Sequence, residues 1–217
     1  MDRAIELNPN SATAHHWKGV YLSIRGHLDE AKVEMHRALE LDPLSLVVMT
    51  DIGQLHYFAH EYDQASDYCN RALSIDPEFH DAHTYLIDIY RMRGMEREAA
   101  NEMIQANRSG SADAQRQAKI LAGQGIGSLI RSNLNEILMQ LSHLPADSDS
   151  RSLWALMAAR AYCRLGDSEQ AIRWLAVAVE KPAAFWTPYI GIDPLYDPLR
   201  KDPRFKDILN HLRLAPT

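Results

Sequence analysis

The sequence has 217 residues, of which 46 % are hydrophobic and 24 % are charged, a composition typical of soluble globular proteins. Its formal net charge is -6, and its basic residues are interspersed with acidic ones, so the basic stripe that nucleic-acid binding usually needs is absent. No apolar run approaches the roughly 20 residues that cross a bilayer. The two cysteines, Cys69 and Cys163, lie far apart within helical patterns, so we expect no structural disulfide.

One constant interval recurs through the first half of the chain. It separates the members of three sets, namely Ala4, Ala38, Ala72 and Ala106, then Ala31, Ala65 and Ala99, and finally Pro9, Pro43 and Pro77. Within every set the residue number rises by 34 from one member to the next. Three independent sets with one spacing indicate an internal structural repeat, which has to be recognised before local structure is assigned. The interval predicts a fold built from stacked copies of one unit.

Each unit is predicted to be a pair of antiparallel helices. Apolar residues recur at three- and four-residue spacing between Leu28 and Leu39, which indicates an amphipathic helix. A polar turn with Gly26 or Gly94 separates the two helices, and a proline stops the second helix. Alanine at a helix crossing lets two helix axes approach closely, so a larger side chain at Ala31 or Ala65 would force the pair apart.

With this interval and pattern, the sequence resembles the tetratricopeptide repeat family. The small residue at the family's eighth repeat position is matched by Gly19 and Gly53, and the aromatic residue at its eleventh position is matched by Tyr90. The resemblance implies an all-α fold, a right-handed superhelical solenoid of antiparallel helix pairs with a C-terminal capping helix.

The predicted organisation begins with a half-repeat. Residues 1–11 should hold the second helix of a truncated repeat, because Ala4 and Pro9 align with Ala38 and Pro43. Three full repeats are then predicted at residues 12–45, 46–79 and 80–113. A degenerate helical pair should follow at 114–151 and a further repeat at 152–185. A proline-rich turn with C-terminal capping helices is predicted at 186–217.

Two positions depart from the family pattern. The first-helix tryptophan is replaced by His15, Met49 and His83, and the second-helix aromatic residue is replaced by Met35, Cys69 and Met103. These residues still supply bulk to the interior of each hairpin, so the fold prediction is unchanged.

The C-terminal stretch contains Asp-Pro pairs that begin at Asp193, Asp197 and Asp202. Such pairs suit helix starts, with Asp as the cap and Pro at the first helical position, better than they suit metal ligands. We expect one short helix and a final helix to about Leu214. This tail resembles the end of repeat domains on bacterial winged-helix one-component transcriptional regulators. That narrower resemblance implies a cytoplasmic regulatory module, or alternatively a periplasmic sensory domain of a membrane-anchored regulator.

Motifs that would indicate phosphate binding, metal binding or catalysis are weak in this sequence. The glycine-rich segment 123–128 joins two helices, so we interpret it as a turn and not as a phosphate loop. His56 and His60 are four residues apart, a spacing that can place two metal ligands on one helix face, but no third ligand is in register. Cys69 occupies a packing position, and Cys163 has no identifiable base beside it. We therefore predict no metal, no cofactor and no catalytic residue.

If the family's arrangement holds, the first helices line a concave, peptide-binding groove. The predicted groove residues are His16, Val20, Ile24, Thr50, Gln54, Tyr57, Phe58, Thr84, Asp88, Arg91 and Met92. Tyr57 and Phe58 are the best anchors because aromatic rings bring a large contact area, although packing in the core is an equal alternative for Phe58. One family subtype binds a C-terminal carboxylate with Lys, Asn and Arg at fixed groove positions. In this sequence those positions hold other residues, so this mode of binding is not predicted.

The leading hypothesis is a protein- or peptide-binding scaffold, the regulatory module of a larger bacterial signalling or transcription protein. One rival is self-assembly, with a homodimer formed through the open N-terminal end; an enzyme is the remote rival. The half-repeat at the N-terminus should expose an apolar edge that includes Ile5 or Leu7. We expect this edge to be covered by a preceding helix or by a second copy of the chain.

Overall fold

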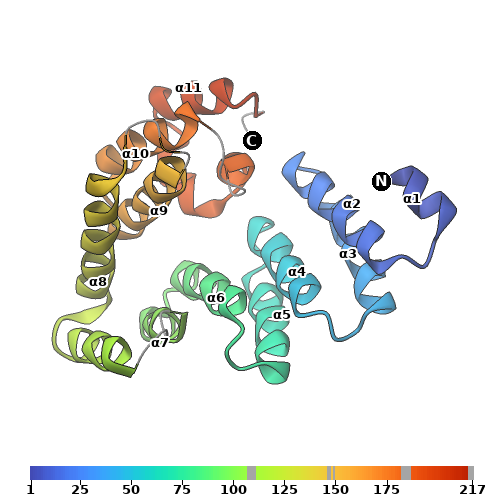
Figure 1. The fold of residues 1–217 in the computed structure, drawn as a ribbon, viewed down its shortest axis with the longest axis horizontal. Helices are drawn as coiled ribbons and strands as arrows, with labels where there is room; N and C mark the ends of the chain where they lie inside the picture. The colour runs from blue at the N-terminus through green and yellow to red at the C-terminus, as the bar shows by residue number, and fades with distance from the viewer. Residues whose placement is uncertain (107–110, 146–147, 149, 182–186, 215–217) are drawn as a thin grey trace. The chain divides into compact units, whose positions relative to one another are not determined.

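A computed structural model describes the backbone of residues 1–106, 111–145, 148, 150–181 and 187–214, and the side chains of all of these except 111–115, 117–119 and 122. Within these residues every regular element is a helix, and neighbouring helices pair in antiparallel fashion (Figure 1). The predicted all-α fold of antiparallel helix pairs is therefore confirmed. The chain divides into an N-terminal unit, Met1–Ala118, and a C-terminal unit, Lys119–Thr217.

The N-terminal unit begins with one short helix and continues with three helical hairpins. The helices are α1 (Asp2–Leu7), α2 (Ala12–Ile24), α3 (Leu28–Leu41), α4 (Leu46–Phe58), α5 (Tyr62–Ile75), α6 (His80–Met92) and α7 (Glu96–Ala106). The pairs α2 and α3, α4 and α5, and α6 and α7 pack against each other, and α3 and α5 also contact the first helix of the following hairpin. The three hairpins fall within residues 12–45, 46–79 and 80–113, the ranges predicted for the repeats, and residues 107–110 lie outside the described part of the chain.

Local sequence signals explain where these helices begin and turn. Ser11 and Ser45 cap α2 and α4, since their hydroxyl oxygens accept hydrogen bonds from the backbone N–H groups of Ala14 and Val48. The turn between the two helices of each hairpin needs a residue with positive φ. Gly26, Gly94 and Gly166 supply it in three hairpins, and His60 takes the same conformation with a φ of 61°.

Small residues hold the two helices of each hairpin close together. Ala31, Ala65 and Ala99 are completely buried, as the alanine pattern predicted. A Cβ atom added to Gly19 would lie 2.5 Å from Cγ of Met35, and one added to Gly53 would lie 2.9 Å from Sγ of Cys69. These contacts leave no room for a larger residue at either glycine, so the second-helix side chains Met35 and Cys69 fill the space that glycine leaves.

Helix α8 (Ser111–His143) contains the boundary between the two units and one interruption. Gly125 has a φ of 74° and a ψ of 175°, which is not helical, so two helical segments meet at this residue. The expected turn within the glycine-rich segment 123–128 is therefore a single break at Gly125.

The C-terminal unit is built around one further hairpin, α9 (Ser150–Leu165) and α10 (Ser168–Glu180). Two 3₁₀ helices, η1 (Thr187–Gly191) and η2 (Pro194–Leu199), and the last helix α11 (Pro203–His211) follow it. The buried residues of α9 and α10 share one core with residues of η1, η2 and α11, which include Ile190, Tyr196, Phe205 and Leu209. The tail therefore covers the last hairpin, as a capping segment should.

The aspartates of the tail behave as predicted at two of three positions. The side chain of Asp193 accepts a hydrogen bond from the N–H of Leu195, and that of Asp202 accepts one from the N–H of Arg204. The prediction that Asp197 caps a helix is wrong. Asp197 lies inside η2, and its carboxylate accepts a hydrogen bond from Nε of Arg200 at 2.6 Å. The second Asp-Pro pair therefore continues a 3₁₀ helix instead of starting a new one. The single short helix expected here is two consecutive 3₁₀ helices.

Candidate functional site

The residues predicted to bind a ligand all lie on the first helices of the three N-terminal hairpins. Helix α4 packs against both α2 and α6, so these three helices form one continuous layer (Figure 1). The structure thereby places on one layer side chains that are far apart in the sequence, such as Ile24 on α2 and Met92 on α6. We call this layer of α2, α4 and α6 the first-helix surface.

Exposure divides the predicted groove residues into two sets. Buried are Val20, Thr50, Gln54, Tyr57, Phe58 and Asp88. Partly exposed are His16, Ile24, Thr84, Arg91 and Met92. The two proposed aromatic anchors thus belong to the buried set, and the ring of Tyr57 packs near those of Phe58 and Tyr62, with centroids 5.8 and 6.1 Å apart. The partly exposed set is the one that a ligand can reach in the conformation described.

Two of the predicted hydrogen-bonding residues use their hydroxyl groups within their own helices. Oγ1 of Thr50 donates to the carbonyl oxygens of Leu46 and Val47, both at 3.0 Å. Oγ1 of Thr84 donates to the carbonyl oxygen of His80 at 3.1 Å. Such bonds to the preceding turn are common for threonine in helices, and they leave little donor capacity for a ligand.

His16 and Asp51 join α2 to α4 on the first-helix surface. Nε2 of His16 lies 2.7 Å from Oδ2 of Asp51, and both side chains are largely buried. Burial raises the pKa of Asp51 above its ordinary value, against the opposite effect of the hydrogen bond from His16. His16 was expected to face a ligand, but its Nε2 atom is already engaged with a neighbouring repeat.

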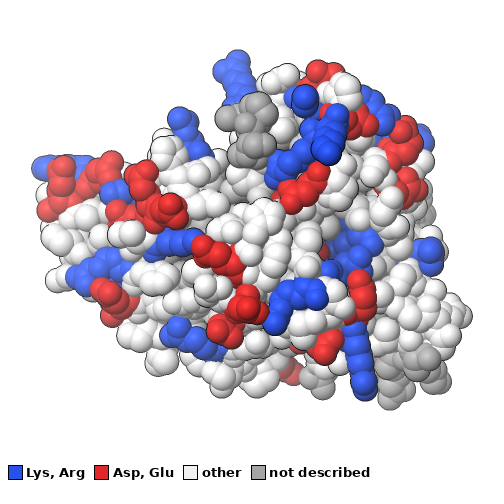
Figure 2. Space-filling view, turned by 180° about the vertical axis from the view of Figure 1, so that it is seen from behind, with Lys and Arg blue, Asp and Glu red and all other residues white. Residues whose placement is uncertain are grey.

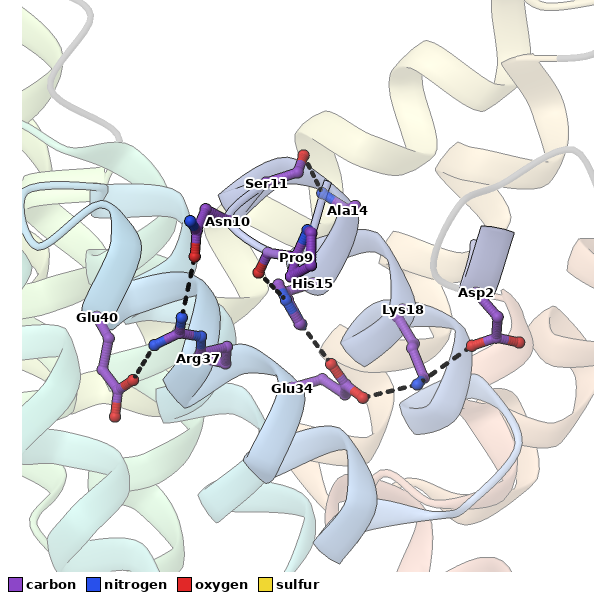
Figure 3. Close-up of polar contacts among 10 residues, drawn as sticks. All are labelled: Asp2, Pro9, Asn10, Ser11, Ala14, His15, Lys18, Glu34, Arg37 and Glu40. Atoms are coloured by element: carbon purple, nitrogen blue, oxygen red, sulfur yellow. Dashed lines mark hydrogen bonds and ion pairs between the residues drawn. The ribbon is translucent and has the colours of Figure 1, made fainter. Parts of the chain in front are cut away.

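A polar network at the start of the chain ties together α1, α2 and α3 (Figure 3). Nδ1 of His15 lies 2.6 Å from Oε2 of Glu34, and its Nε2 lies 3.1 Å from the carbonyl oxygen of Pro9. Lys18 donates to the other oxygen of Glu34 at 2.7 Å and to Asp2 at 3.1 Å. These two hydrogen bonds raise the pKa of Lys18. The network fixes α1 in place on the hairpin that follows it.

The third hairpin contains the same histidine arrangement. Nδ1 of His83 lies 2.5 Å from Oε2 of Glu102, and its Nε2 lies 3.0 Å from the carbonyl oxygen of Pro77. Both partners of each histidine are hydrogen-bond acceptors, so only a ring that is protonated on both nitrogens can donate to both. Sequence reasoning missed the two glutamates. Their signal was available, because the histidine, the glutamate and the proline of the first repeat all recur at twice the repeat interval in the third.

The histidines considered as metal ligands have separate partners. His56 lies 2.5 Å from Glu61 and stacks on Tyr68, whereas Nδ1 of His60 lies 2.9 Å from the hydroxyl of Tyr62. In the described residues no group of three or more His, Cys, Asp and Glu side chains is arranged to hold a metal ion.

The cysteines have different environments. Cys69 is completely buried, and burial raises the pKa of its thiol far above the ordinary value, so the thiolate form is strongly disfavoured. Cys163 is partly buried and packs at the edge of the C-terminal core. A buried thiol with a raised pKa is a packing group and a poor nucleophile, as was expected for Cys69.

Charges of both signs are intermixed on the molecular surface. On the face in Figure 2, lysine and arginine side chains lie among aspartate and glutamate side chains, with uncharged surface between them. The helices in the described part of the chain include none that is long and apolar enough to cross a membrane.

Comparison with protein-family models finds two matching segments in the N-terminal unit. Residues 1–33 match one model of the tetratricopeptide repeat, and residues 48–79 match a second. These two segments are similar to tetratricopeptide repeats. The first matched segment covers α1, α2 and the beginning of α3. The narrower resemblance to winged-helix transcriptional regulators has no support in these matches.

The chain also resembles several solved structures. A tetratricopeptide repeat protein called YrrB, described as having an unusual peptide-binding site, is 21 % identical over 83 % of this chain and 92 % of its own, with a TM-score of 0.47. PilF of Pseudomonas aeruginosa is 15 % identical over 93 % of this chain and 90 % of its own, with a TM-score of 0.49.

PilW, described as a widely conserved type IV pilus biogenesis factor, is 14 % identical over 93 % of this chain and 92 % of its own, with a TM-score of 0.50. At these identities the similarity concerns the fold alone. The sequence matches none of the curated proteins with which it was compared.

Proposed function

We propose that this chain is a protein- or peptide-binding scaffold whose ligand lies along the first-helix surface. The observation that carries the proposal is the continuous layer formed by α2, α4 and α6, since stacked helical repeats typically present such a layer as an extended binding surface. Tetratricopeptide repeats are typically interaction scaffolds without catalytic activity, which favours binding over an enzymatic function.

The side chains that a ligand can reach suggest its chemistry. Ile24 and Met92 offer apolar contacts. Arg91, whose Nη1 lies 3.2 Å from Oε2 of Glu96, offers a guanidinium with five N–H donors that can also pair with a carboxylate or a carbonyl oxygen. Nε2 of His16 and the hydroxyl of Thr84 are already engaged within the chain, so these two residues add little polar recognition. A peptide with apolar anchors and an acidic or carbonyl-rich segment fits this combination.

A displayed random peptide library, selected against the immobilised chain, supplies the probes for the test. Selected peptides are titrated against the variants Ile24→Ala and Met92→Ala, and against Val33→Ala and Ile75→Ala as matched controls. Val33 and Ile75 are apolar and exposed, but they lie on the second helices α3 and α5. We expect the first pair of variants to weaken binding by about 1 kcal/mol or more and the controls to leave it unchanged.

Tyr57→Ala is the third informative variant, because its ring was expected to be an anchor and is buried in the structure. If Tyr57 contributes to the binding surface, the variant weakens peptide binding by more than its loss of folding stability explains. Peptides that lose affinity only with the Val33 and Ile75 variants would refute the assignment of the ligand to the first-helix surface.

The proposal has a narrower form, in which the scaffold is the regulatory module of a bacterial signalling or transcription protein. Its support is the resemblance of the tail around Asp193 and Asp202 to the repeat domains of such regulators. The general proposal does not depend on it, because the first-helix surface lies in the N-terminal unit.

A further inference from the structure

Three side-chain rings join the first hairpin to the second. His36 lies on α3 of the first hairpin, and His56 and Tyr68 lie on α4 and α5 of the second. The ring centroid of His36 lies 6.4 Å from that of His56 and 5.7 Å from that of Tyr68, and the centroids of His56 and Tyr68 are 5.6 Å apart. We call these three residues the histidine junction. Each ring contacts the other two, and two of the three contacts cross between the hairpins.

The link between His36 and Tyr68 depends on the protonation state of the imidazole. The hydroxyl oxygen of Tyr68 lies 3.2 Å from Nε2 of His36. A neutral imidazole with its hydrogen on Nδ1 accepts the hydroxyl hydrogen at Nε2, whereas a protonated imidazole has two N–H donors and no acceptor. Protonation of His36 therefore removes the acceptor that the hydroxyl of Tyr68 faces.

His56 is linked to the second hairpin in a way that tolerates either protonation state. Its Nδ1 atom lies 2.5 Å from Oε2 of Glu61, and Nζ of Lys32 lies 2.7 Å from the same oxygen. The hydrogen bond from Lys32, assisted by that from His56, outweighs burial and lowers the pKa of Glu61. The carboxylate is thus an ionised acceptor, and Nδ1 of His56 donates to it from a neutral or a charged ring.

The charged and titratable groups around His36 and Tyr68 come from three helices. They are Lys32 and Glu40 on α3, His56 on α4, and Arg71 on α5, with Glu61 at the start of α5. Glu40 is itself paired with Arg37 at 2.9 Å. On the side of α3 that packs against α2, His15 and Lys18 are engaged with Glu34. The carboxylates near this junction therefore have cationic partners other than His36.

These surroundings favour the neutral form of His36. Burial lowers the pKa of His36, and the charge that His56 can carry lowers it further. A hydrogen bond to the backbone of Lys32 and the charge of Glu40 act in the opposite direction without outweighing them. A folded-state pKa below the unfolded value of about 6.5 gives a stabilisation that is constant above that pH and is lost as pH falls through the folded-state pKa.

We propose that the histidine junction is a proton-sensitive coupling between the first two hairpins, in which neutral His36 holds α3 to α5 through Tyr68 and protonation in mildly acidic solution loosens this link. The stability of a repeat protein includes a contribution from each interface between neighbouring units. A weaker junction therefore lowers the local stability of the helices on both sides of it. The proposal concerns the stacking of the hairpins and does not rest on the function of the first-helix surface.

The first test measures the titration of His36 in the full chain by nuclear magnetic resonance. The Cε1–H signal of His36 is assigned by its loss in His36→Gln and is followed from about pH 8 to about pH 5. We expect His56→Gln to move the midpoint to higher pH, because it removes the facing positive charge. Tyr68→Phe should move it in the same direction, because the neutral ring loses its hydrogen-bond donor.

The second test measures the coupling itself by amide hydrogen exchange of α3 and α5 at about pH 7.5 and about pH 5.5. Results are expressed as protection factors, which remove the intrinsic effect of pH on exchange. Acidification should lower protection in the parent by about threefold or more. His36→Gln should abolish most of this fall, because its amide oxygen accepts from Tyr68 at both pH values. His27→Gln is the matched control and should behave as the parent, since His27 is exposed at the start of α3 and pairs with Glu30 of the same turn.

Two results would overturn the proposal, provided that circular dichroism shows the variants folded at both pH values. One is a midpoint of His36 that neither His56→Gln nor Tyr68→Phe moves, because the two rings would then have no influence on its protonation. The other is a pH-dependent fall in protection that is as large in His36→Gln as in the parent, because another group would then be responsible.

Discussion

The imidazole of His83 lies against the carboxylate of Glu102, with Nδ1 and Oε2 2.5 Å apart, and His15 and Glu34 repeat this pair in the first hairpin. In the middle hairpin the same two positions hold Met49 and Tyr68. Equivalent positions are thus filled in two ways. One is a polar pair whose histidine also bonds the carbonyl of the preceding turn, and the other is Met49 with Tyr68, whose hydroxyl lies 3.2 Å from Nε2 of His36. The polar pair depends on both partners being present.

Replacing His83 by Met should therefore destabilise the protein by about 1–3 kcal/mol, because Glu102 and the carbonyl of Pro77 lose their partner in a largely buried place. The double variant with His83→Met and Glu102→Tyr recreates the middle hairpin's pair and should recover most of that loss. Urea unfolding followed by circular dichroism measures both free energies. Additive losses in the double variant would show that the two residues are not an interchangeable unit.

The ionisation of Glu34 should make stability depend on pH. Burial acts to raise the pKa of Glu34, but hydrogen bonds from Lys18 and His15 outweigh it, so the pKa lies below its ordinary value. A folded-state pKa below the unfolded value of about 4.3 gives a stabilisation that is present at neutral pH and is lost as pH falls through the folded-state pKa.

Glu34→Gln is the variant that tests this dependence. At pH 7 it should be less stable than the parent by about 1–3 kcal/mol, and the difference should shrink as the pH is lowered below about 4.3. Glu6→Gln is the matched control, since Glu6 pairs with Arg3 on the exposed surface of α1, where ion pairs contribute about 0–1 kcal/mol. A difference between parent and Glu34→Gln that stays constant down to pH 3 would contradict the role given to this carboxylate.

Much of the fold could be predicted from the sequence because the packing of each hairpin repeats. Completely buried alanines at Ala31, Ala65 and Ala99 need only a periodic pattern to be found. The polar pairs were harder to predict, since Glu34 meets His15 across a hairpin and neither belongs to the family pattern. The second Asp-Pro pair in the tail was misinterpreted because its sequence suits a helix start and the interior of a 3₁₀ helix equally well.

The candidate binding surface could be predicted only as a set of positions. The repeat pattern assigns residues to the first helices, and α2, α4 and α6 do form one layer. Exposure of each side chain depends on what packs over it, which the pattern of one helix does not contain. Tyr57 and Phe58 were therefore placed on the right helix, while their burial emerged only from the structure.

The spacing of the two helices in the second hairpin depends on Ala65. This residue is completely buried, and its carbonyl oxygen would lie 3.0 Å from a Cβ atom added to Gly53, so the helices are already in close contact. Ala65→Leu should overpack the hairpin and cost about 1–3 kcal/mol of unfolding free energy. Gln64→Leu, on the exposed side of the same helix, is the control and should change stability little. An unchanged melting curve for Ala65→Leu would show that the hairpin can open without loss.

His60 occupies a position where three other hairpins use glycine. Its φ is 61°, and Gly26, Gly94 and Gly166 have φ values of 79°, 72° and 77°. For a residue with a side chain this left-handed conformation costs about 1–2 kcal/mol, whereas glycine adopts it freely but loses more backbone entropy on folding. His60→Gly should therefore stabilise the protein by up to about 1 kcal/mol, less whatever the hydrogen bond between His60 and Tyr62 contributes.

The reciprocal variant Gly94→His makes this prediction sharper. Nothing lies within 4 Å of a Cβ atom added to Gly94, so the cost of a side chain there is the cost of the backbone conformation alone. We expect Gly94→His to lower the free energy of unfolding by about 1 kcal/mol. Thermal and urea unfolding of both variants give the two values. If His60→Gly lowers stability while Gly94→His also lowers it, the contact of His60 with Tyr62 outweighs the strain, and the histidine is retained in the second turn for its side chain.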